Sequence, residues 1–139
     1  MFGLTKRQFL KRSKECLKEI GIQILLFRAL LDKESKEGIY NHEAHRQLDN
    51  IRKDIETTFS WYEKLNPPSK CISLQQKILN AMIIFHDCVI INSESLVASR
   101  IGKHGESYIK FKQSKQELEK FKEIFLPLSR EVDRYLQKK

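Results

Sequence analysis

A chain of 139 residues has the size of one domain, and folding at this size buries about two-thirds of the surface that the unfolded chain exposes. A core is therefore expected without disulfides or metal ions. The formal net charge of +8 at pH 7 permits anionic partners and bears on solubility rather than on fold. The cysteines are odd in number and form no C-x-x-C pair, which excludes a disulfide framework and a zinc knuckle and favours the reducing cytoplasm: Cys16, Cys71 and Cys88.

The longest apolar stretch near the N-terminus covers residues 20–31 and is shorter than the roughly 20 residues that a membrane-spanning helix needs. It also contains Gln23 and Arg28. The charged residues Asp32 and Lys33 follow it, where a signal peptide would have a cleavage site made of small residues. We therefore expect a cytoplasmic protein with no transmembrane segment and no signal peptide.

The first helix is predicted to run from Thr5 to about Lys36. Thr5 and Gln8 have the spacing of a capping box, and Gly38 is a typical residue for a C-cap. The residues expected to face the core follow one another at alternating spacings of three and four, which keeps them on one stripe of a helix: Leu10, Ser13, Leu17, Ile20, Ile24, Phe27 and Leu31, widened by Phe9, Cys16 and Leu30.

A second helix is predicted from an N-cap at Asn41 to about Leu65. Proline lacks an amide proton and disfavours helical geometry in the residue before it, so Pro67 and Pro68 end this helix. The predicted core stripe again alternates spacings of four and three: Ala44, Leu48, Ile51, Ile55, Thr58, Tyr62 and Leu65.

A third helix is predicted to open with a capping box of Ser73 and Gln76 and to end at Gly102. Between residues 78 and 97 it is apolar on most faces, which is typical of the most enclosed helix of a bundle. Isoleucine and valine also favour strands, but the chain offers no second strand-like segment for pairing.

The fourth helix is expected to start near residues 105–107, and Pro127 should kink it or split it in two. Four amphipathic stripes with short connections predict an all-α fold, an antiparallel up-down-up-down four-helix bundle. We expect residues 1–139 to form one domain of this kind.

Motifs for catalysis are absent from the sequence. His42 and His45 lie three residues apart, but a catalytic metal needs about three converging ligands, and no such set is apparent. The glycines at 102 and 105 lack the strand and the GK[ST] pattern of a phosphate-binding loop. We therefore predict neither an enzyme, nor a cofactor, nor a metal site.

Polar residues interrupt the apolar third helix and suggest a weak ligand-pocket hypothesis. His86 and Asp87 could form a proton-transfer pair if both were buried, but adjacent helical residues point about 100° apart, which favours an exposed polar edge. Small polar residues further along could line a pocket or could allow close helix packing, which we favour: Asn92, Ser95 and Ser99.

A basic stripe runs along the first helix beside its apolar stripe, at spacings of four, three and four: Arg7, Lys11, Lys14 and Lys18, with Arg12 nearby. It could follow a phosphate backbone or an anionic membrane surface. A solvated face is favoured over these uses, because Glu15 and Glu19 are placed to pair with Lys11 and Lys18.

The functional prediction rests mainly on elimination. We predict a small interaction or regulatory module that binds a protein partner, or a second copy of itself, through an exposed helical face. The alternatives are nucleic-acid binding through the basic stripe and a bundle enzyme or small-ligand binder that uses the third helix.

Overall fold

The computed structural model describes residues 3–38 and 42–138. Within these ranges the chain forms four long helices and no strand, which confirms the all-α prediction. A short 3-10 helix, η1 (Ser69–Cys71), precedes the third of them. The four helices are α1 (Lys6–Glu37), α2 (His42–Glu63), α3 (Ile72–Arg100) and α4 (His104–Gln137).

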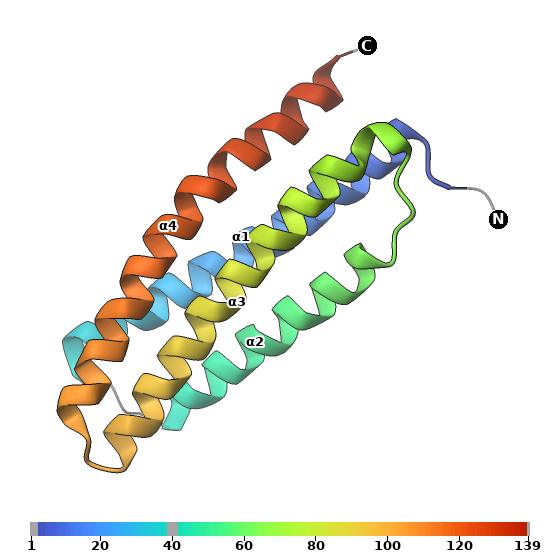
Figure 1. Cartoon of the computed structure of the whole chain (residues 1–139). Coiled ribbons are helices and arrows are strands. Elements are labelled where there is room, and N and C mark those ends of the chain that lie inside the picture. The colour runs from blue at the N-terminus through green and yellow to red at the C-terminus, as the bar shows by residue number, and fades with distance from the viewer. Residues whose placement is uncertain (1–2, 39–41, 139) are drawn as a thin grey trace.

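The helices lie side by side and alternate in direction, so that α1 begins and α4 ends at the same end of the bundle (Figure 1). Each helix contacts the next one in the chain, and α4 closes the ring against α1. A diagonal contact also joins α1 to α3, whereas the described Cα atoms of α2 and α4 stay more than 8 Å apart. This arrangement is the predicted antiparallel up-down-up-down bundle.

Aromatic side chains in the core connect all four helices. Phe85 of α3 is stacked on Phe121 of α4, with ring centroids 4.9 Å apart, and it meets Phe27 of α1 edge-on at 5.9 Å. Near the opposite end, Phe9 packs against Tyr62, whose hydroxyl hydrogen-bonds the Ser13 hydroxyl at 2.7 Å. Buried aromatic pairs of this kind contribute about 0.5–1.5 kcal/mol beyond their burial, and they fix how the helices align.

The first helix begins and ends as predicted. Thr5 and Gln8 form the capping box, with the Gln8 amide donating to Thr5 Oγ1 at 3.1 Å and the Thr5 amide donating to Gln8 Oε1 at 2.9 Å. Gly38 is the C-cap with a φ of 104°, a region that favours glycine. The predicted N-cap of the second helix, Asn41, lies outside the described residues.

The connection between α2 and α3 differs from the prediction. Helix α2 ends at Glu63 rather than Leu65, and the predicted capping box of Ser73 with Gln76 does not form. The reason is that helical geometry is already established before Ser73: η1 follows Pro68, and the Cys71 amide donates to the Pro68 carbonyl at 2.8 Å. Ser73 therefore lies inside α3, and its hydroxyl is not at a cap.

The third helix was expected to be the most enclosed, and the fourth was expected to kink or split at Pro127. Helix α3 buries residues along its whole length, but Ile83 and Val97 remain about half exposed, so one side of this apolar helix faces outward. Helix α4 runs continuously through Pro127, which excludes the predicted split into two pieces. Pro127 itself is exposed, so the ring points away from the core.

Candidate interaction face and neighbouring pockets

The side of α1 that points away from the bundle carries basic residues at both ends and apolar residues between them. All of these side chains are exposed and, apart from the adjacent Leu25 and Leu26, follow one another at helical spacings of three and four. One exposed acidic residue, Asp32, lies among them, seven residues after Leu25. We call this surface the α1 outer face, and it consists of Arg7, Lys11, Lys14, Lys18, Ile22, Leu25, Leu26, Ala29, Lys33 and Lys36.

The predicted basic stripe forms the first half of this face, but the predicted pairing of its charges is wrong. Glu15 pairs with Arg12 at 2.6 Å, and Glu19 accepts a hydrogen bond from Thr58 of α2 at 2.8 Å. Both carboxylates are drawn to the α2 side of the helix. Among the described residues, neither Lys11 nor Lys18 takes part in an ion pair, and neither does Arg7.

The other two basic residues of the prediction have partners. Lys14 Nζ lies 3.0 Å from Asp133 Oδ1 on α4, so it helps to join these two helices. Arg12 lies beside the stripe rather than on it, and its guanidinium stacks on Trp61 of α2, 4.5 Å from the ring centroid. The sequence gives no signal for this contact, because the contact depends on how α1 and α2 align.

The apolar half of the α1 outer face was not predicted from the sequence as part of a binding surface. Ile22, Leu25 and Leu26 are 57%, 65% and 51% exposed, and Leu126 of α4 is 51% exposed. Helix α4 passes close by, since Phe125 lies 4.0 Å from where a Cβ on Gly21 would be. The signal was present in the sequence: the three aliphatic residues of α1 all fall off its predicted core stripe.

Two shallow grooves border the α1 outer face. One, of about 320 Å³, lies between α1 and α4 and has Leu17 and Val132 at its floor and Lys18 on its wall. The other, of about 390 Å³, lies between α1 and α2, next to Leu26 and Lys33. The exposed aliphatic side chains therefore stand on a ridge between two depressions.

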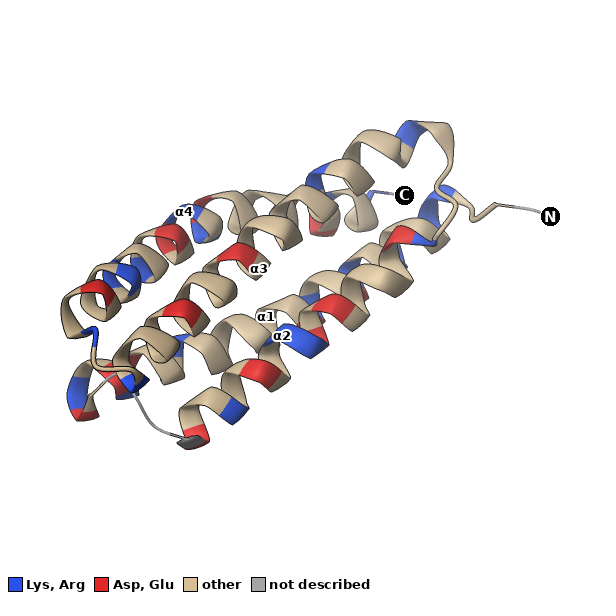
Figure 2. Cartoon of the chain, turned by 60° about the horizontal axis from the view of Figure 1, so that its bottom comes forward, with Lys and Arg blue, Asp and Glu red and all other residues tan. Residues whose placement is uncertain are grey.

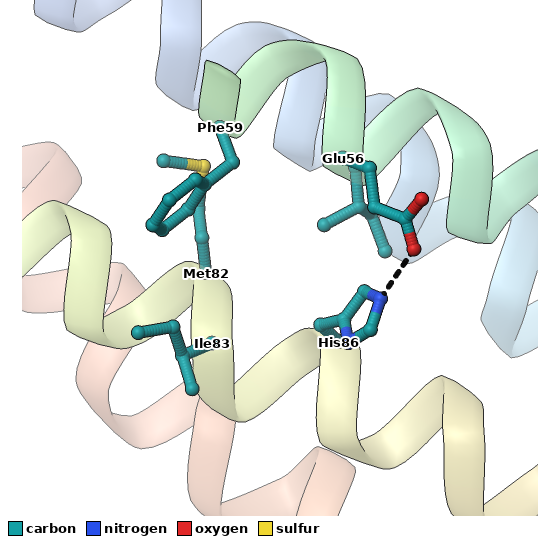
Figure 3. A pocket seen from close by; sticks show the side chains of 6 residues that line it. Glu56, Phe59, Met82, Ile83 and His86 are labelled. Atoms are coloured by element: carbon teal, nitrogen blue, oxygen red, sulfur yellow. Dashed lines mark hydrogen bonds and ion pairs between the residues drawn. The ribbon is translucent and has the colours of Figure 1, made fainter. Parts of the chain in front are cut away.

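A third depression, of about 280 Å³, opens between α2 and α3 (Figure 3). Its floor is formed by the buried side chains of Ile55 and Met82, and Phe59 and Ile83 stand at its sides. The remaining end is closed by His86, whose Nε2 lies 2.8 Å from Glu56 Oε2. This volume is just below the usual range for small-molecule sites and suits one apolar side chain or ring.

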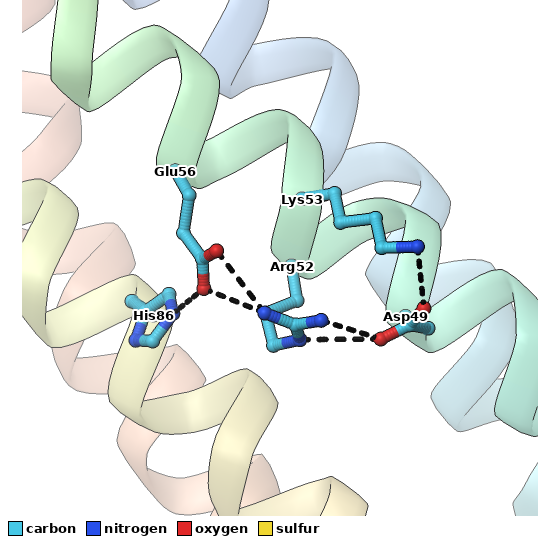
Figure 4. A network of polar contacts seen from close by, with 5 residues as sticks. All are labelled: Asp49, Arg52, Lys53, Glu56 and His86. Atoms are coloured by element: carbon cyan, nitrogen blue, oxygen red, sulfur yellow. Dashed lines mark hydrogen bonds and ion pairs between the residues drawn. The ribbon is translucent and has the colours of Figure 1, made fainter.

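Charges around this pocket neutralise one another (Figure 4). Arg52 bonds Asp49 at 2.7 Å and Glu56 at 2.9 Å, and Lys53 pairs with Asp49 at 3.1 Å. The hydrogen bond from His86, followed by that from Arg52, lowers the pKa of Glu56. Acidic and basic positions also alternate along the ribbon of α2 (Figure 2), whereas Arg7, Lys11 and Lys18 of α1 have no ion pair among the described residues.

The structure separates the two members of the predicted proton-transfer pair. His86 is turned towards Glu56 of α2 and is partly exposed, whereas Asp87 is exposed and is not its partner. The next residue, Cys88, is buried, and burial is the main factor that raises the pKa of its thiol to about 12. These three neighbours therefore do not form a catalytic group.

The polar residues further along α3 are divided among different contacts. The Ser95 hydroxyl donates to the Ser107 carbonyl at 2.7 Å, and the Ser107 hydroxyl donates back to the Ser95 carbonyl at 2.8 Å, which holds α3 close to α4. Asn92 is buried and donates to Glu34 of α1 at 3.0 Å. Ser99 is half-buried. The contacts of Asn92 and Ser95 join α3 to α1 and to α4, and they do not gather the three residues into one pocket.

The described residues contain no group of three or more histidine, cysteine, aspartate or glutamate side chains that could hold a metal ion. His45 is exposed, and the side chain of His42 lies outside the described part. By length and composition, the segment Ser69–Arg100 is apolar enough to cross a membrane, with half of its most apolar stretch buried inside the bundle. Core helices of soluble proteins meet the same criterion, so this evidence is weak.

Comparison with protein-family models, with curated proteins and with solved structures found no match.

Proposed function

We propose that the chain is an interaction module that binds another protein through the α1 outer face. The observation that carries this proposal is the line of exposed aliphatic side chains at Ile22, Leu25 and Leu26, continuous with basic residues that have no ion-pair partner in the described chain. Exposed apolar side chains that gather beside polar ones are typical of protein-binding surfaces. Grooves on both sides of the ridge offer places for side chains of a partner.

The same face makes nucleic-acid binding a weaker second candidate. Arg7, Lys11 and Lys18 are suitable for phosphate contacts. A phosphate backbone, however, gains little from aliphatic side chains, and the apolar residues lie in the middle of the face rather than at its edge. Protein binding uses both halves of the surface, and nucleic-acid binding uses one.

The proposal is tested by capture of proteins from cells of the source organism with the tagged chain and a double variant, Ile22→Glu with Leu25→Glu. We expect a defined partner to be captured by the native chain and lost from the variant, because two charges would have to be buried at the contact. Both positions are largely exposed, so the fold should persist, which circular dichroism checks.

The matched control is Ile109→Glu, because Ile109 is 66% exposed on α4 and lies outside the α1 outer face. This variant should capture the partner as well as the native chain does. Equal capture by all three proteins would show that the α1 outer face is not the binding surface.

A further inference from the structure

The groove between α1 and α4 extends along α1 from Lys14 to Gly21, about two helical turns. Gly21 has no side chain that would fill this groove. The space above it is open, because even an added Cβ would be 4.0 Å from its nearest neighbour, the Phe125 ring. The floor of the groove is apolar, with Leu17 and Val132 both buried, and it runs along the two helices that form it. An amphipathic helix that lies in such a groove contacts it through residues spaced three and four apart.

The exposed residues of α1 repeat with a matching period. Lys18, Ile22, Leu25 and Ala29 follow one another at spacings of four, three and four, and Leu126 of α4 is exposed where α4 passes Gly21. A further helix laid against this side could interdigitate its own apolar residues with this row, as neighbouring helices of a bundle do.

Charge decides what kind of helix fits. On the α1 outer face, basic residues without an ion pair in the described chain lie both before and after the aliphatic residues: Arg7, Lys11, Lys18 and Lys36. The exposed carboxylate of Asp32, seven residues after Leu25, lies on the same side, and the basic residues outnumber it. The acidic residue on the α4 side of the groove, Asp133, is already paired with Lys14. The complementary surface is therefore acidic at its edges and apolar in its middle.

The same charges argue against a second copy of this chain at the α1 outer face. Two such faces packed against each other would place basic ends against basic ends in either orientation, and like charges across an interface are unfavourable. The partner must then be a different molecule, with the opposite charge.

We infer that the α1 outer face binds an acidic amphipathic helix of another protein, which lies along α1 in the groove that α1 forms with α4. This inference rests on the proposed function and adds the chemistry of the partner. Aliphatic residues of the bound helix pack against Ile22, Leu25 and Leu126, and its carboxylates meet Lys11 and Lys18.

The test uses two synthetic three-heptad helical peptides with leucine at the core positions and either glutamate or lysine at the flanking positions. Fluorescence anisotropy measures their binding to the full chain. We expect the glutamate peptide to bind more weakly as salt is raised, and the lysine peptide to bind at least about tenfold more weakly than the glutamate peptide.

The variants locate the site. Leu25→Glu should weaken the glutamate peptide about tenfold or more, because it replaces an apolar contact with a like charge. Ile109→Glu, equally exposed on α4, should change its affinity by less than about twofold. Equal binding of both peptides, or equal effects of the two variants, would overturn the inference.

Anionic vesicles of phosphatidylglycerol and phosphatidylcholine, and duplex DNA, are measured in parallel. Binding to either of them that depends on Leu25, without binding of the glutamate peptide, would overturn the inference in favour of a membrane or nucleic-acid ligand. Should cellular capture depend on Ile22 and Leu25 while the glutamate peptide fails to bind, the docking proposal stands and the acidic-helix inference falls.

Discussion

Glu34 and Asn92 form a polar pair inside the core, between α1 and α3. Asn92 Nδ2 donates to Glu34 Oε2 at 3.0 Å, whereas Glu34 Oε1 and Asn92 Oδ1 have no hydrogen-bond partner among the described residues. Both of these atoms are acceptors when the carboxyl is ionised, so the ionised pair leaves two buried acceptors without a donor. Burial is the main factor that raises the pKa of Glu34 to about 7, and the Asn92 hydrogen bond lowers it.

The raised pKa of Glu34 predicts a specific pH dependence of stability. A group whose folded pKa lies above its ordinary value of 4.5 stabilises the fold fully below that value, and the contribution is lost as pH rises through about 7. The loss is on the order of 3 kcal/mol, from the size of the shift. Urea unfolding at several pH values should show it in the native chain and not in Glu34→Gln, which keeps a neutral amide there. Identical pH profiles of the two proteins would contradict this account.

At the scale of single elements, the two predicted capping boxes have different outcomes. Thr5 forms its box because an irregular segment precedes it, with the Leu4 amide bonded to the Asn66 carbonyl at 3.2 Å. Ser73 does not, because η1 has already turned the chain into helical geometry. The four-residue pattern is the same in both places, and the residues before it decide whether a cap is needed.

This difference predicts unequal effects of two similar substitutions. Thr5→Ala should lower the free energy of unfolding by about 1 kcal/mol, because it removes the hydrogen bond to the Gln8 amide. Ser73→Ala should change it by less than about 0.5 kcal/mol, since Ser73 is exposed within α3. Urea denaturation of both variants measures these changes, and a larger cost at Ser73 would mean that it does cap a helix.

The sequence was sufficient to predict the four helices and their order, because each buried stripe repeats with the helical period. It was not sufficient for contacts that depend on how two helices align. The pairs Glu34 with Asn92, His86 with Glu56 and Arg12 with Trp61 each join residues far apart in the chain. For the same reason the sequence favoured packing for the small polar residues of the third helix but could not name their partners.

For the molecule as a whole, the charges that give the net +8 are unevenly paired along the chain. On α2 the basic residues pair with acidic neighbours one turn away, such as Arg46 with Glu43 and Arg52 with Glu56. On the α1 outer face, Lys11 and Lys18 have no ion pair within the described chain. The exposed aliphatic residues follow them on the same side of the helix. We propose that this contrast marks α1 as the side on which the bundle binds a partner.

Site-specific photo-crosslinking tests this claim most directly. A photoreactive amino acid replaces Leu25 in one protein and Ile109 in another, and both are expressed and irradiated in cells of the source organism. We expect a discrete crosslinked protein from position 25 that is absent from position 109, although Leu25 and Ile109 are equally exposed. The same products from both positions, or a discrete product from position 109 alone, would contradict this claim.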